Sequence, residues 1–97
     1  MFKYNRVKKA HRTSGIPIFS VEIVNNCPSG CQVYNVHIDC GQFSSDILIN
    51  PSTFRRINIG DCRVNDGKPF AAGSVISFKY ATTSQISMSV SSLECSK

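Results

Sequence analysis

The chain has 97 residues, 41% of them apolar, which describes one globular domain rather than two domains or a disordered chain. No apolar run approaches the roughly 18 residues that a membrane-spanning helix needs. The net charge is +5, from 11 basic and 6 acidic side chains. The whole excess lies before Thr13, at Lys3, Arg6, Lys8, Lys9 and Arg12. Because the rest is neutral, the net charge does not indicate a nucleic-acid-binding domain.

The first fifteen residues are polar and basic and predict a flexible arm (1–15), so the single folded domain is expected over residues 16–97. Phe19–Asn25 alternates apolar and polar residues, as a half-buried strand does. Gln32–Cys40 alternates in the same way and predicts a second strand. Its buried face is expected to hold Tyr34, Val36, Ile38 and Cys40, with Val33, Asn35, His37 and Asp39 on the other face.

Turn-forming residues separate these strands from the later ones. Phe54–Ile59 predicts a short strand or a single helical turn. Asn65–Pro69 predicts a turn, because Asn, Asp and Gly tolerate positive φ. Val75–Ala81 and Gln85–Leu93 alternate again and predict two strands joined in a hairpin around Thr82–Ser84. Short strands with frequent turns are typical of an all-β fold, here a small antiparallel β-sandwich or barrel.

Five cysteines in 97 residues form the strongest compositional signal. Small secreted domains use disulfides to supplement a modest core, whereas structural zinc sites favour two closely spaced cysteine pairs. This chain has one such pair, so the pattern predicts disulfides and neither a metal site nor a cofactor. An odd count leaves one thiol unpaired or paired outside this chain, and the connectivity stays open. The five are Cys27, Cys31, Cys40, Cys62 and Cys95.

The sequence predicts no catalytic site. Nucleophilic catalysis needs an activated Ser or Cys with a histidine and an orienting acid. The two histidines are His11, in the arm, and His37, on the polar face of a strand beside Asp39. A solvated surface histidine is the simpler interpretation of His37, so we expect a protein that is not an enzyme. The basic arm has no apolar signal-peptide stretch behind it, so the chain is either intracellular or a fragment whose true N-terminus lies upstream. The cysteine content favours a fragment of a secreted protein.

Two polar segments, Phe54–Arg56 and Asn65–Pro69, are the candidates for a partner surface. Binding residues tend to lie on loops held by a rigid scaffold, and arginine pairs suit carboxylate-rich partners. The simpler alternative is that both segments are turns with charged flanks. Phe43 and Phe54 are expected in the core, because buried aromatic rings dominate small β-cores. The predicted contact residues are Arg55, Arg56, Asn65, Asp66 and Lys68.

Several stretches in order carry a family resemblance. They include Cys27-Pro28-Ser29-Gly30-Cys31, Cys40-Gly41-Gln42-Phe43-Ser44-Ser45, Asp61 to Pro69, and Ser77-Phe78-Lys79-Tyr80-Ala81. Over residues 16–95 the chain resembles the tapetum determinant-like proteins of plants. The resemblance implies a secreted, extracellular cysteine-rich ligand that binds a leucine-rich-repeat receptor kinase ectodomain in anther cell-fate signalling. It also implies an upstream sixth cysteine, and a tryptophan where this chain has Gln42.

A second functional class stays open beside this one. A β-sandwich can serve as a lectin-like or cell-wall-binding module, in which Tyr34 or Tyr80 would stack on a sugar ring. The chain has no tryptophan, which weakens this alternative. Nucleic acid is not an expected partner, because the basic arm offers no aromatic platform beyond Phe2 and Tyr4.

Overall fold

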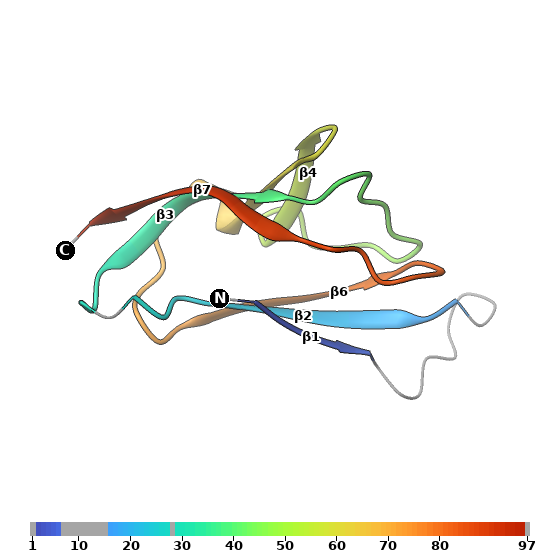
Figure 1. The fold of residues 1–97 in the computed structure, drawn as a ribbon, viewed down its shortest axis with the longest axis horizontal. Helices are drawn as coiled ribbons and strands as arrows, with labels where there is room; N and C mark the ends of the chain where they lie inside the picture. The colour runs from blue at the N-terminus through green and yellow to red at the C-terminus, as the bar shows by residue number, and fades with distance from the viewer. Residues whose placement is uncertain (1, 7–15, 28, 97) are drawn as a thin grey trace.

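Two antiparallel β-sheets pack face to face (Figure 1). The computed structural model describes residues 2–6, 16–27 and 29–96. The first sheet has the order β1-β2-β6 and contains β1 (Phe2–Arg6), β2 (Ile18–Val24) and β6 (Val75–Ala81). The second has the order β4-β5-β3-β7 and contains β4 (Phe54–Asn58), β5 (Asp61–Val64), β3 (Gln32–Asp39) and β7 (Ser89–Ser96). The predicted antiparallel β-sandwich is confirmed.

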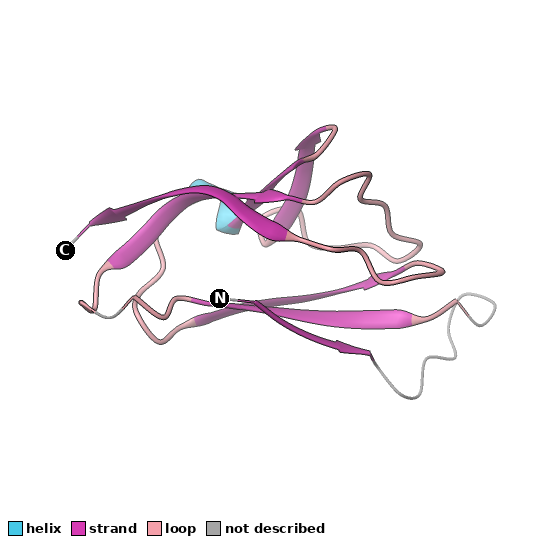
Figure 2. Ribbon diagram, viewed as in Figure 1, coloured by secondary structure: helices cyan, strands magenta, loops and turns pink. Residues whose placement is uncertain are grey.

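Both layers consist of strands. In the described residues, the one other regular element is a short 3-10 turn, η2 (Asn65–Gly67), as Figure 2 shows. In this turn Asn65, Asp66 and Gly67 all have positive φ, between 55° and 77°, as predicted for Asn, Asp and Gly. No helix in the described part of the chain is long and apolar enough to cross a membrane.

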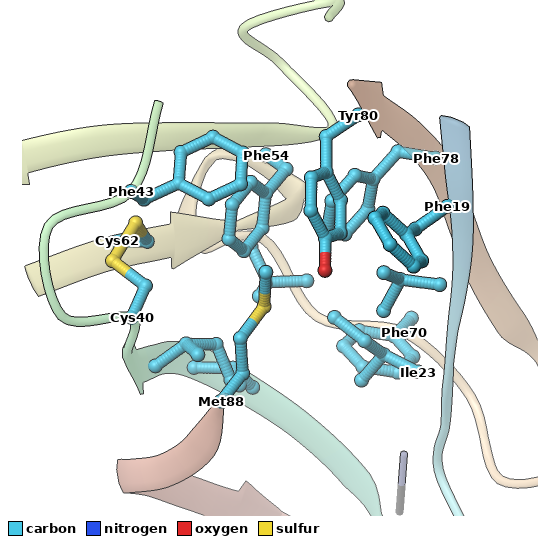
Figure 3. Packing of buried hydrophobic residues seen from close by; sticks show 14 of the residues in the cluster. Phe19, Ile23, Cys40, Phe43, Phe54, Cys62, Phe70, Phe78, Tyr80 and Met88 are labelled. Carbon is cyan, nitrogen blue, oxygen red and sulfur yellow. A yellow bond between two sulfur atoms is a disulfide. The ribbon is translucent and has the colours of Figure 1, made fainter. Parts of the chain in front are cut away.

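The core lies between the sheets and is rich in aromatic rings (Figure 3). In the first sheet the alternation of β2 matches that of β6, since Phe19 pairs with Tyr80 and Val21 with Phe78. Phe54 of the second sheet stacks on Phe78 of the first, with ring centroids 4.1 Å apart. Offset and edge-to-face ring pairs add about 0.5–1.5 kcal/mol beyond their area burial. Phe54 therefore joins the two layers, and both Phe43 and Phe54 are buried as predicted.

The structure differs from the sequence prediction at the N-terminus. Phe2–Arg6 was expected in a flexible arm, but it forms β1 and pairs with β2 from Phe2↔Ile23 to Arg6↔Phe19. An antiparallel neighbour completes the hydrogen bonds that a strand edge would otherwise leave open, so pairing with β2 outweighs the polar composition of this segment. Residues 1 and 7–15 of the predicted arm lie outside the described residues.

Strand β3 departs from the predicted alternation at one point. Val33 and Val36 are both buried, at 2% and 1% exposure, although an uninterrupted strand would turn them to opposite faces. Asn35 between them has a φ of 49°, and the register with β7 shifts between Tyr34 and His37. This β-bulge changes the face of the strand. The predicted orientation is therefore correct for Val36 and wrong for Val33 and Tyr34.

The predicted hairpin between the last two strands is wrong. β6 pairs with β2, whereas β7 pairs with β3 in the other sheet. The connection between them crosses the sandwich, and its Ile86 N–H donates to the Tyr80 hydroxyl at 2.9 Å. Alternation along a segment predicts a strand but not the strand with which it pairs, because pairing with β3 or with β6 would satisfy the same alternating pattern. β5 was not predicted as a strand at all, and it forms the hairpin with β4 instead.

Two disulfides are present. Cys27–Cys31 closes the turn between β2 and β3, and Cys40–Cys62 links the end of β3 to β5 with both residues at 0% exposure. Cys95 is unpaired and exposed on β7. No cluster of three His, Cys, Asp or Glu residues in the described ranges could hold a metal ion.

The buried Tyr80 phenol is expected to make the stability of the fold decrease with pH in the alkaline range. Burial raises the pKa of its phenol above 10.0, and the hydrogen bond from Ile86, which lowers it, is the smaller effect. The folded state therefore holds the phenol proton more tightly than the unfolded chain. Stability from this group is complete below pH 10 and is lost as pH rises through the folded pKa. Tyr80→Phe should flatten the fall in unfolding free energy above pH 10, measured by urea titration in a Cys95→Ser background.

Tyr34→Phe is the matched control for this measurement, because Tyr34 is only half-buried and lies outside the aromatic cluster. The Cys95→Ser background removes the exposed thiol, which would otherwise exchange with the disulfides at high pH. Equal alkaline slopes in Tyr80→Phe and the parent would contradict the role assigned to Tyr80.

Candidate partner-binding surface

A row of side chains crosses the outer face of the second sheet. Phe54 of β4 and Val64 of β5 lie opposite each other and are buried in the core. The residues next to them along each strand therefore face outward. Arg55 of β4 lies opposite Arg63 of β5, Arg63 opposite His37 of β3, and His37 opposite Ser92 of β7. We call these four residues the outer row.

Acidic residues beside the outer row hold two of its members. His37 Nδ1 lies 2.8 Å from Asp61 Oδ1, and the Arg63 guanidinium donates to Asp66 Oδ1 at 2.7 Å. All four side chains are about 28–43% exposed. Ion pairs at such exposure contribute only about 0.2–1 kcal/mol each to stability. Their main effect here is therefore to orient Arg63 and His37 on the surface.

Arg55 and Arg56, predicted as one contact pair, lie on opposite faces of the sheet. Arg55 faces outward in the outer row and is exposed. Arg56 lies opposite the buried Cys62, and its guanidinium donates to the backbone carbonyl of Phe43 at 3.3 Å. Because a strand turns successive side chains to opposite faces, the two arginines cannot act on one partner group. The structure assigns Arg56 a role in joining the edge strand β4 to the Phe43 segment.

The other predicted contact residues surround η2, next to the outer row. The Asn65 side-chain amide donates to the carbonyls of Lys68 and Pro69, so it is used within the turn. Asp66 pairs with Arg63, and Lys68 is exposed beside it. The structure thus brings both Asp66 and Arg55 next to Arg63. Sequence reasoning missed Arg63 because β5 was not predicted as a strand.

Asp61, His37 and Ser92 lie across three strands in the order of an acid, a base and a nucleophile. No hydrogen bond joins Ser92 to His37, both of which lie within the described residues. They line a shallow hollow of about 410 Å³ together with Asn35, Leu93 and Glu94. Nucleophilic catalysis needs the nucleophile within hydrogen-bond reach of its base and a site that stabilises the developing charge. His37 pairs with Asp61 rather than with Asp39, its neighbour on the same predicted face.

The fold and this surface define a small disulfide-linked β-sandwich with a polar, mixed-charge outer face. Within that class the chain belongs to the tapetum determinant 1 family, since the family model "Tapetum determinant 1, C-terminal" matches residues 2–96. The match begins with β1, in agreement with the place of that strand in the first sheet. The family resemblance predicted from the sequence is confirmed.

Curated plant proteins give the same result. The chain is 46% identical over 82 residues to TPD1 protein homolog 1 of Arabidopsis thaliana, covering 84% of this chain and 46% of that protein. It is 42% identical over 85 residues to TPD1 protein homolog 1B of Oryza sativa subsp. japonica, covering 88% of this chain and 50% of that protein. The chain thus spans about half the length of the curated relatives it matches. No solved structure gives a significant match.

Proposed function

We propose that the chain is the receptor-binding domain of a secreted cysteine-rich signalling ligand. Its partner would be the leucine-rich-repeat ectodomain of a plant receptor kinase, with a role in anther or other reproductive cell-fate specification. The observation that carries the proposal is membership of the tapetum determinant 1 family over residues 2–96. The proposal places the protein outside the cell.

The two disulfides support an oxidising, extracellular compartment, where such bonds persist. They also restrict the loops between the strands. A surface that is already ordered loses less conformational entropy on association, which leaves more of the contact energy as affinity. Rigid display of the outer face is therefore the mechanism we propose, with no covalent chemistry.

A lectin-like or cell-wall-binding module is the alternative. It requires an exposed aromatic ring on which a sugar can stack. Tyr80 is fully buried and its hydroxyl accepts a hydrogen bond from Ile86, so it is not available to a sugar. Of the two tyrosines considered, only Tyr34, which is half-buried on β3, could still contact a sugar. These contacts favour the ligand proposal over the sugar-binding one.

The test is binding of the oxidised chain to a panel of leucine-rich-repeat receptor ectodomains, measured by biolayer interferometry beside a plant glycan array. We expect saturable binding to an ectodomain, and loss of that binding once both disulfides are reduced and alkylated. Binding to glycans without binding to any ectodomain would replace the proposal with the alternative. Binding to neither would overturn both.

A further inference from the structure

We propose that Arg55 and Arg63 together bind one carboxylate side chain of the protein partner, at the β4–β5 end of the outer row. The existence of a partner rests on the proposed function. The location and chemistry of the site come from contacts within this chain.

The first observation is that two arginines lie directly opposite each other on neighbouring strands. Residues opposite in an antiparallel pair have Cβ atoms about 4.5–5.5 Å apart, and like charges in this arrangement destabilise the sheet. A carboxylate placed between the two guanidinium groups would relieve that repulsion. Each guanidinium is a planar fork that can bond both oxygens of a carboxylate.

The second observation is that most of the donors in this pair are unused. Arg55 forms no hydrogen bond or ion pair with any residue in the described part of the chain. Arg63 makes one bond, from a terminal nitrogen to Asp66; its Nε also lacks a partner there but is buried, so the donors open to a ligand are those at the end of the guanidinium. A guanidinium carries five N–H donors. The pair therefore keeps several outward donors for a ligand.

The third observation is that Arg63 is already positioned. Asp66 holds its guanidinium, and the η2 turn holds Asp66. Gly67 closes this turn at a φ of 77°, where a Cβ would stand 3.3 Å from Asn35 Oδ1 and 3.7 Å from Arg63 Cδ. The positive φ and the close approach to Asn35 both favour glycine here, and they keep the turn in place beside the Arg63 stem. Side chains oriented before binding lose less entropy on binding.

The surrounding charges select the class of ligand. Asp66 pairs with Arg63 and Asp61 pairs with His37, the next residue of the outer row, while Glu94 accepts a hydrogen bond from Asn35 at 2.6 Å. These acids would repel a polyanion, such as a polyuronate or a sulfated polysaccharide, which places a negative charge at every repeat. A protein surface of mixed charge can present one Asp or Glu to the arginines and basic groups to the acids. A protein carboxylate is therefore the ligand that fits.

One experiment needs no receptor. The Nε–H resonances of Arg55 and Arg63 are followed by NMR in the oxidised chain at low salt, while N-acetylglutamate is added. We expect saturable shifts at Arg55 and Arg63, lost in Arg55→Gln, with no comparable shift at Arg56. Equal responses at all three arginines would overturn the site. A far tighter response to oligogalacturonate than to N-acetylglutamate would overturn the protein carboxylate as the ligand.

The second experiment uses the ectodomain that binds the parent chain. Arg55→Gln should weaken that binding roughly 10- to 100-fold, and Arg63→Lys, which keeps the charge but not the fork, roughly 5-fold or more. Lys79→Gln is the matched control, since it removes one exposed positive charge from the other sheet, and it should change affinity less than twofold. Melting temperatures identify any variant that fails to fold. Equal losses in Arg55→Gln and Lys79→Gln would overturn the site, even where receptor binding itself is established.

Discussion

Replacing Cys40 and Cys62 together by alanine is expected to lower the free energy of unfolding by about 3–5 kcal/mol. This bond spans 22 residues, and the loop-entropy relation gives about 3.4 kcal/mol for a loop of that length. Both sulfur-bearing side chains are also fully buried beside the aromatic core, so their removal leaves unfilled space (Figure 3). Alanine is preferred to serine because a buried hydroxyl without a partner would add its own penalty.

The Cys27–Cys31 bond provides the matched control. It spans only 4 residues, for which the same relation gives about 1.9 kcal/mol, and Cys27 is only half-buried. Both double variants are compared by urea unfolding in a Cys95→Ser background, so that no free thiol can rearrange the remaining bond. Equal losses in the two variants, or a smaller loss for Cys40 and Cys62, would contradict the assignment of Cys40–Cys62 as the main covalent support of the fold.

Asn25→Ala is expected to destabilise the protein by about 2–4 kcal/mol, because it removes three side-chain hydrogen bonds from a buried position. The Asn25 side chain is 1% exposed. Its amide nitrogen donates to the carbonyls of Cys31 and Phe70 at 2.9 and 3.0 Å, and its oxygen accepts from the Cys27 N–H at 3.0 Å. One side chain thus joins the disulfide turn to the segment before β6, and its loss leaves buried backbone groups without partners.

Asn26→Ala is the control for this variant, because Asn26 is the adjacent residue, has the same side chain and is exposed. Its effect should stay within about 0.5 kcal/mol, as for most surface substitutions. Urea unfolding of both variants, with the disulfides intact, makes the comparison. A loss for Asn25→Ala that is no larger than for Asn26→Ala would show that the three bonds do not stabilise the folded state.

The candidate site was predictable only in part, and the reason is strand order. Arg55 and the turn from Asn65 to Lys68 were identified because polar, turn-forming residues have local signatures. His37 was placed on an outer face, but its partner is Asp61, which is 24 residues away along the chain. Arg63 entered the site through β5, whose four residues are too short for a periodic signal. Residues that meet across three strands have no common signature in the sequence.

Local chemistry in the sequence determined the all-β class, the strands β2 and β6, the η2 turn and the presence of disulfides. Alternation with period two and residues that tolerate positive φ act within a few neighbours, so they can be read without a fold. Only the tertiary structure decided that β7 pairs with β3 rather than with β6, that a bulge at Asn35 turns Val33 inward, and that Arg55 faces Arg63. Pairing and register depend on which distant strand completes the hydrogen bonds of each edge and buries its apolar face, and that choice is made by the whole chain.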